Sequence, residues 1–275
     1  MRPGTSKAAL ALAALLAGCV AGPDYHVPEK AMVNAASAQG RFEGAEGPAF
    51  SDAPLPDHWW RLYRDPALDG LIEEALAANT DLRIADANLR AATEVVRQTE
   101  LNRTFEPQLS TGVGLARLYA TEMPATGEPS YNAAIAGALP LDLSGQIRRA
   151  IEASRADAEV VVAARDQVRV AVAGAVTRAY LATCAANIRI AAAKRVIGIQ
   201  EQTHAATRKL QKYGRGTAFD TTRARAAVQQ SEASLPALLA ARQAALFQLA
   251  TLMGRPPAEY PRAVEGCAAL PAIVG

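Results

Sequence analysis

Three cysteines and three histidines are the side chains of this sequence with the most obvious chemistry. His26, His58 and His204 lie far apart, and none has the spacing of a metal site or a nucleophile beside it. Acidic residues such as Glu152 and Asp166 are scattered along helical stretches, as solvated charges are. We therefore expect no catalytic residue, no metal site and no cofactor.

Cys19 has a specific chemical role by its position. A basic N-terminus precedes an apolar run at residues 8–16 that is too short to span a bilayer, and the run ends in Leu-Ala-Gly-Cys. This ending resembles a bacterial lipobox, which predicts a signal peptide at 1–18 and a lipid on Cys19. The alternative is a plain secretory signal with a chance cysteine. Val20, in place of Asp, favours the outer membrane by resemblance to Gram-negative lipoproteins.

The other two cysteines leave two alternatives open. Cys184 falls in a long helical stretch, and Cys267 lies near the C-terminal end. An oxidising periplasm permits a disulfide, but the sequence does not give the distance between the two residues. The sequence is therefore compatible with a Cys184–Cys267 disulfide and equally with two unpaired cysteines.

Composition narrows the classes of protein. Lys and Arg number 29 against 27 Asp and Glu, so the formal net charge is +2. No basic patch carries interleaved aromatic residues, which argues against nucleic acid as a partner. Aromatic residues are only 5% of the chain and Ala is very common, which suits helical bundles better than an enzyme pocket.

A very long helix is the main predicted element. No proline occurs between Pro140 and Pro236, and apolar residues recur mostly at steps of four or seven. The helix is expected from Ser144 to Lys212, about 70 residues and about 100 Å. Such a helix must pack beside similar helices. Its predicted stripe is Ile147, Ile151, Ala158, Val162, Val172, Val176 and Tyr180.

A glycine-containing turn follows this helix. Its residues are Tyr213, Gly214, Arg215, Gly216 and Thr217. The glycines allow a tight reversal, and Thr217 with an acid three residues later resembles a capping box. A returning helix is expected from residue 218 to about 253, kinked at Pro236 and ended by a Gly-Arg-Pro-Pro sequence.

Before the long helix, the sequence predicts two helices and then two strands. Asp65-Pro66 starts the first helix, residues 79–81 break it, and the second ends near Arg103. Apolar and small or polar residues alternate along 109–116 and along 131–141.

Each alternating run has the length of a transmembrane β-strand, although a soluble hairpin is the alternative. Two strands cannot close a barrel, so a membrane role requires further strands. The expected divisions are 1–18 signal peptide, 19–57 lipid-anchored extended arm, 58–106 N-terminal helices, 107–142 two strands with an extracellular loop at 118–130, 143–253 helical hairpin, and 254–275 irregular tail.

Several stretches together resemble a known family. They are GPDY at residues 22–25, the run from Trp59 to Ala92, the strand-to-helix junction 141–154, the run 178–195, YGRGTAFD at 213–220 and LATLMGRPP at 249–257. The chain is identified as similar to the NodT-type lipoproteins of RND efflux pumps, within the TolC-like outer-membrane factors. The resemblance covers nearly the whole mature chain.

This resemblance implies a passive trimeric duct. Its fold would be mainly α, with a long helical hairpin forming tunnel staves and a two-stranded β-hairpin contributing to a membrane β-barrel. The partners would be a periplasmic adaptor, an inner-membrane RND pump, outer-membrane lipid and other copies of the chain. Residues 213–217 would contact the adaptor. The chain would be an outer-membrane, lipid-anchored and mostly periplasmic protein.

One departure from the family is clear. Members contain two copies of the strand–strand–hairpin unit, whereas this sequence contains one and ends where a linker to the second would begin. We therefore expect a truncated copy; the alternative is a channel of six chains. The alternative function is a periplasmic adaptor lipoprotein, but adaptors flank their hairpin with halves of a lipoyl-like β domain. An enzyme is the third and least favoured class.

Overall fold

The computed structural model describes residues 25–40, 44, 56–116 and 128–272. Cys19, the predicted signal peptide and most of the predicted loop 118–130 lie outside these residues. The chain divides into one unit formed by Met1–Glu29 and Asn88–Val162 and a second formed by Lys30–Ala87 and Ala163–Gly275. Each is described by itself.

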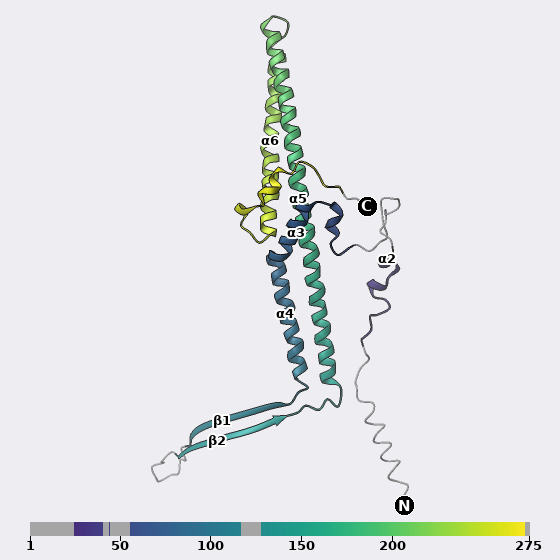
Figure 1. Cartoon of the computed structure of the whole chain (residues 1–275), viewed down its shortest axis with the longest axis vertical. Coiled ribbons are helices and arrows are strands. Elements are labelled where there is room, and N and C mark those ends of the chain that lie inside the picture. The colour runs from purple at the N-terminus through teal and green to yellow at the C-terminus, as the bar shows by residue number, and fades with distance from the viewer. Residues whose placement is uncertain (1–24, 41–43, 45–55, 117–127, 273–275) are drawn as a thin grey trace, which may run out of the picture. The chain divides into compact units, whose positions relative to one another are not determined.

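The described residues form long helices and one pair of strands (Figure 1). In chain order the elements are η1 (Met32–Asn34), α2 (Ala36–Gln39), η2 (Trp59–Tyr63), α3 (Pro66–Ala78), α4 (Thr80–Leu101), β1 (Glu106–Ala116), β2 (Glu128–Ala138), α5 (Gln146–Lys212), α6 (Ala218–Leu252), η3 (Pro257–Glu259) and η4 (Arg262–Gly266). The predicted mainly α fold with a two-stranded β-hairpin and a long helical hairpin is confirmed.

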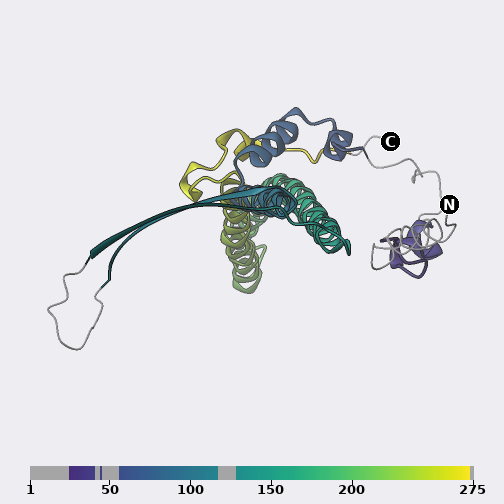
Figure 2. The ribbon, with the colours of Figure 1, turned by 90° about the horizontal axis from the view of Figure 1, so that it is seen from below.

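In the first unit, the later turns of α4 lie beside the first turns of α5. Arg155 on α5 donates to Glu100 on α4 at 2.5 Å, and this hydrogen bond holds the pKa of Glu100 below its usual value. The β1–β2 pair follows α4 and precedes α5, and Figure 2 shows the two strands running side by side.

The second unit contains the hydrophobic core. Side chains from η2, α3, the middle of α5, the end of α6 and the C-terminal tail pack together there. Trp60 is 2% exposed and is one of the residues of this core. The largest fully buried side chains are Leu68, Ile72, Leu246, Leu249, Met253, Val176, Thr183 and Cys184.

Asp65 starts α3 and ties it to α5. Its Oδ1 accepts from the backbone N–H groups of Ala67 and Leu68, and Oδ2 accepts from the Tyr180 hydroxyl at 2.6 Å. Pro66 occupies the first helical position, as predicted. Burial, together with the neighbouring Asp65 carboxylate, raises the pKa of Tyr180 above its usual value.

Asn79 causes the predicted break between α3 and α4. It is 3% exposed, and its Oδ1 accepts from the N–H groups of Asp81 and Leu82. Its Nδ2 donates to the Leu252 carbonyl at 2.8 Å, so one buried amide starts α4 and satisfies a carbonyl at the end of α6.

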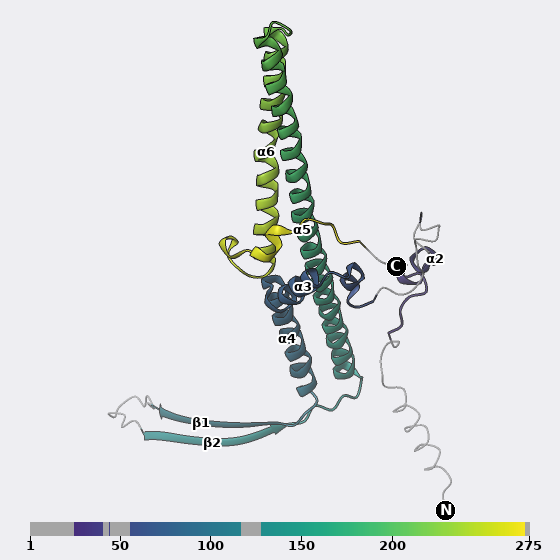
Figure 3. The ribbon, with the colours of Figure 1, turned by 45° about the horizontal axis from the view of Figure 1, so that its top comes forward.

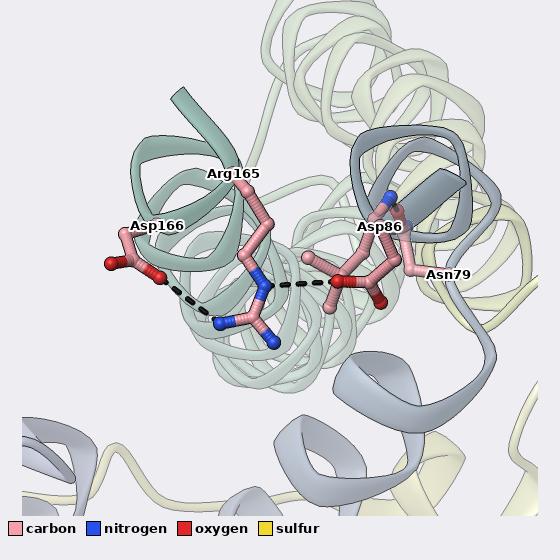
Figure 4. Close-up of polar contacts among 5 residues, drawn as sticks. Asn79, Asp86, Arg165 and Asp166 are labelled. Carbon is pink, nitrogen blue, oxygen red and sulfur yellow. Dashed lines mark hydrogen bonds and ion pairs between the residues drawn. The ribbon is translucent and has the colours of Figure 1, made fainter. Parts of the chain in front are cut away.

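A charged cluster joins α4 to α5 in the second unit. Arg165 Nε lies 2.9 Å from Asp86 Oδ1, and its terminal nitrogen lies 3.0 Å from Asp166 Oδ1 (Figure 4). The hydrogen bond to Asp86 and then that to Asp166 raise the pKa of Arg165 above its usual value. The Arg165–Asp86 ion pair therefore holds α4 beside α5, and Asp166, on α5 itself, binds the same guanidinium.

The helices α5 and α6 form the predicted long hairpin (Figure 3). Helix α5 begins two residues later than expected. Most of the predicted stripe is buried or half-buried, but Val162 is 42% exposed, although Val172, Val176 and Tyr180 further along the same stripe are buried. Helix α6 continues through Pro236 without a break, although Pro236 cannot donate a backbone hydrogen bond.

Two segments expected to be irregular contain short helical turns. The described part of the arm includes η1 and α2, whose residues are not buried. The tail contains η3 and η4, and Val264 in η4 is only 3% exposed. Asn187 on α5 donates to the carbonyls of Glu265 and Cys267, so the tail is fixed against α5.

Candidate functional site

The strand pair has two chemically different faces. In the antiparallel register, Leu109 lies opposite Ile135 and Val113 opposite Tyr131. Because side chains alternate along a strand, these four share one face. The other face carries small or polar residues, paired as Ser110 with Ala134, Gly112 with Asn132 and Gly114 with Ser130. The alternation predicted for both strands is therefore confirmed by their register.

Each strand has the dimensions of a membrane strand. Both contain 11 residues, which is about 37 Å at 3.4 Å per residue and about 26 Å of depth at a 45° tilt. That depth matches the apolar band of an outer-membrane barrel, about 25 Å tall. The described sheet has only these two strands, so each has an unpaired edge.

The ends of β2 differ from the sequence prediction. It begins at Glu128 and ends at Ala138, so the last residues of the predicted loop 118–130 belong to the strand, and Leu139 and Leu141 lie beyond it. Pro129 lies near the strand end, where a missing N–H is tolerated.

Asp142 begins the long helix after the strands. Its carboxylate accepts from the backbone N–H of Ile147 at 3.1 Å and of Arg148 at 2.9 Å. These hydrogen bonds, that of Arg148 above all, hold the pKa of Asp142 below its usual value. Nearby in the same unit, the Tyr25 backbone N–H donates to Glu152 at 3.4 Å, so the arm contacts α5.

The hairpin tip, defined as residues Tyr213–Thr217, is built from two standard ends of helices. Gly214 has φ 71°, its N–H donates to Gln211, and the N–H of Arg215 donates to Leu210. This is a Schellman motif. Thr217 then forms the predicted capping box with Asp220, and the Thr217 hydroxyl holds the pKa of Asp220 below its usual value.

Apolar side chains next to the hairpin tip are exposed. Leu210 is 47% exposed, Tyr213 65% and Phe219 72%. Because both helix ends are closed by local hydrogen bonds, the tip keeps its shape while leaving this apolar surface uncovered. Such a surface suits contact with another protein.

Of the two alternatives left open for Cys184 and Cys267, the structure shows the disulfide. Cys184 on α5 and Cys267 in the tail are joined as a disulfide, with their Cα atoms 4.9 Å apart. Cys184 is fully buried in the core. The bond closes a loop that includes the whole hairpin tip and α6, because the two residues are 83 apart in sequence.

The histidines do not meet. His58 stacks edge-on against Trp60, with ring centroids 5.2 Å apart, and His204 lines a cleft between α5 and α6. Among the described residues, no group of three His, Cys, Asp or Glu side chains is placed to hold a metal ion.

That cleft was missed from the sequence, where His204 was noted only as lacking metal-site spacing and a neighbouring nucleophile. His204 and Arg208 on α5 and Thr221, Thr222 and Arg225 on α6 line it together. The i, i+4 spacing within each helix was visible in the sequence, but the faces that the two helices turn toward each other were not.

Helices α5 and α6 are also long and apolar enough to cross a membrane by length and composition. Helices in the core of a protein share this length and composition. In α5, 44% of the apolar window is buried within the structure. In α6 the buried share is 22%, so packing within the described chain covers less than half of the apolar stretch of either helix.

Known proteins share this fold and parts of this sequence. The family model for "Outer membrane efflux protein" matches residues 71–255. The probable efflux pump outer membrane protein TtgC of Pseudomonas putida is 29% identical over 240 residues, covering 82% of this chain and 47% of TtgC. Nodulation protein T of Rhizobium leguminosarum bv. trifolii is 25% identical over 250 residues, covering 88% of this chain and 50% of that protein.

Solved structures of outer-membrane channels are also similar to this chain. The outer-membrane channel OprN matches with a TM-score of 0.79 at 29% identity, over 93% of this chain and 56% of OprN. VceC of Vibrio cholerae, with a TM-score of 0.64 and 24% identity over 80% of this chain and 54% of VceC, supports the fold alone.

The chain spans about half the length of the curated relatives it matches. The family model itself covers well over half of this chain, from α3 to the residues just after α6. The chain therefore belongs to the outer membrane efflux protein family.

Proposed function

We propose that this chain contributes to the outer-membrane channel of a tripartite RND-type efflux pump, a passive duct through which small molecules leave the periplasm. The strand pair carries the proposal. It combines membrane length, one apolar and one small or polar face, and two unpaired edges. The long helical hairpin then extends the duct into the periplasm.

The open edges require neighbouring strands in the bilayer, because unpaired backbone groups are costly in lipid. Other copies of the chain supply them in this proposal, so the working form is a homo-oligomer; the family resemblance implies a trimer. Apolar residues such as Val113 and Ile135 face lipid, and the opposite face lines the duct. The loop between the strands is extracellular.

A lipid on Cys19 anchors the mature chain in the outer membrane. Cys19 precedes Tyr25 by six residues, which reach at most about 20 Å when extended. The contact of Tyr25 with Glu152 supports this arrangement, because it holds the arm against the part of α5 next to the strands.

The hairpin tip docks on a periplasmic adaptor, which connects it to the inner-membrane pump. The exposed Leu210, Tyr213 and Phe219 supply an apolar contact surface on a rigid turn. In this proposal the pump supplies the energy, as the family resemblance implies.

The test is to isolate the protein from outer membranes and examine it by negative-stain electron microscopy and in planar bilayers. Ring-shaped oligomers with ion conductance are expected. Recovery only as a soluble periplasmic monomer would contradict the channel. A Cys19→Ser variant separates the anchor from the strands: release of unassembled chains from the membrane is expected if lipid is the first anchor, and unchanged retention would assign anchoring to the strands.

A further inference from the structure

A basic cleft lies between the two helices of the hairpin, close to the hairpin tip. Its volume is about 310 Å³, and it is lined by His204 and Arg208 from α5 and by Thr221, Thr222 and Arg225 from α6. Arg208 precedes Tyr213 by five residues, a helical rise of about 7.5 Å. No carboxylate lines the cleft.

The two arginines of the cleft are available to a ligand. Within the part of the chain that the structure describes, neither Arg208 nor Arg225 has an ion pair or side-chain hydrogen bond, and both are exposed. The nearest acidic residue on α6, Asp220, is engaged by the Thr217 hydroxyl at 2.6 Å and by the Thr217 N–H. The local carboxylate thus serves the capping box and leaves the cleft positive.

The sequence around the cleft also carries an excess of positive charge. Between His204 and Arg225 the sequence contains one acidic residue, Asp220, against several basic ones. These are Arg208, Lys209, Lys212, Arg215, Arg223 and Arg225. A second copy placed at the same height would bring the same excess of positive charge, and like charges oppose close contact. A second copy is therefore a poor occupant.

We propose that this cleft receives a carboxylate side chain from the partner that docks on the hairpin tip, so that the partner's matching surface is acidic. Guanidinium groups bind carboxylates through paired N–H donors, and the threonine hydroxyls and the imidazole add further donors. This inference rests on the proposed docking function and adds the chemistry of the partner.

A protein partner fits better than a small anion. The cleft adjoins exposed apolar side chains at Leu210, Tyr213 and Phe219, which a free anion would leave uncovered. An apolar centre with a charged rim is the usual composition of a protein interface. The apolar residues would supply contact area and the cleft would set orientation, since charge complementarity favours specificity over affinity.

The experiment measures binding of the purified periplasmic adaptor of the same bacterium to the full chain in detergent, by biolayer interferometry at low and high salt. The test variant is Arg208→Glu/Arg225→Glu. The control is Lys194→Glu/Arg195→Glu, which makes the same charge change at exposed positions of α5 outside the cleft. Far-UV circular dichroism and melting curves check that both variants fold.

Charge reversal in the cleft should weaken adaptor binding by about tenfold or more at low salt, and the control by less than about twofold. Added salt should reduce the difference, because exposed charges are screened. A compensating change of the contacting adaptor carboxylate to Lys should restore binding to the cleft variant.

Equal binding by the two variants would overturn the acidic-partner proposal and leave docking intact. If the adaptor fails to bind the unaltered chain, the docking function itself fails. Binding of both variants to vesicles of anionic phospholipid is measured as well. If charge reversal in the cleft abolishes vesicle binding but not adaptor binding, the cleft recognises lipid headgroups and the proposal is wrong.

Discussion

The strand pair and the helical core of the second unit bury their apolar side chains very differently. In the core, Leu68, Ile72 and Leu249 are completely buried. On the strands, Val113 is 75% exposed and Ile135 86%, and no described strand side chain is buried. Aliphatic side chains are therefore packed against other side chains in the core but are exposed on the strands.

This difference shows what each region requires from outside the chain. The core is closed by helix caps, tail contacts and a disulfide within a single chain. The strands have open edges and open faces, and an isolated two-stranded hairpin is marginal in water. Substitutions in the core should therefore change folding, whereas substitutions on the strands should change membrane assembly.

The largest expected effect is from a cavity in the core. Leu249→Ala should lower the free energy of unfolding by about 4 kcal/mol, because a fully buried leucine is lost. Val113→Ala on the strands should change it by less than about 0.5 kcal/mol. Urea unfolding in detergent, followed by circular dichroism at a helical wavelength, compares them. Similar losses would contradict the division between the regions.

Reduction of the disulfide should have the next largest effect. Opening the Cys184–Cys267 disulfide should lower the free energy of unfolding by about 3 kcal/mol, because the bond closes a long loop. Melting temperatures with and without dithiothreitol measure the loss. A Cys184→Ser/Cys267→Ser variant is the control and should not respond to the reductant. Free thiols in freshly isolated protein, detected by mass spectrometry, would argue that the bond does not form in the cell.

A smaller effect is expected at a buried amide. Asn79→Ala should lower the free energy of unfolding by about 2 kcal/mol. The Asn79 side chain is the partner of the N–H groups of Asp81 and Leu82 and of the Leu252 carbonyl, and all three would lose it. The matched change Asn132→Ala, at an exposed strand position, should be nearly neutral. Chemical unfolding measures both variants. A neutral result at Asn79 would mean that water replaces the amide and that the core is less closed than described.

The smallest effect concerns the junction between the strands and α5. The folded pKa of Asp142 is lowered, so its stabilising contribution is present above the unfolded pKa of about 3.9 and is lost as pH falls through the folded value. Hydrogen exchange, corrected for intrinsic rates, should show less protection at Ile147 and Arg148 below about pH 4. Asp142→Ala should show the same loss at neutral pH, and Asp157→Ala should not.

Local signals in the sequence predicted most helix ends. Helix caps lie where the sequence predicted them, because capping depends on residues only a few positions apart. They are formed by Asp65 before Pro66, by Asn79, and by Thr217 with Asp220. The two faces of the strand pair were also predicted correctly, because the alternation of side chains depends only on neighbouring residues in each strand. The start of β2 was missed because residues 128–130 were assigned to the predicted loop.

Long-range features could not be predicted in this way. The pairing of Cys184 with Cys267 depends on how the tail folds back on α5, across 83 residues. The basic cleft depends on the rotation of α5 relative to α6, which no local pattern specifies. Val162 was placed on the apolar stripe by its spacing, yet it is 42% exposed, because spacing along one helix does not show where another element packs against it.

The central claim is that the strand pair lies in a bilayer with its apolar face toward lipid. Single cysteines at Ser110, Val113, Ala134 and Ile135 can be probed with a water-soluble maleimide in isolated outer membranes. The account predicts labelling at Ser110→Cys and Ala134→Cys and protection at Val113→Cys and Ile135→Cys. Equal labelling of both faces would indicate a hairpin in water and would contradict the account.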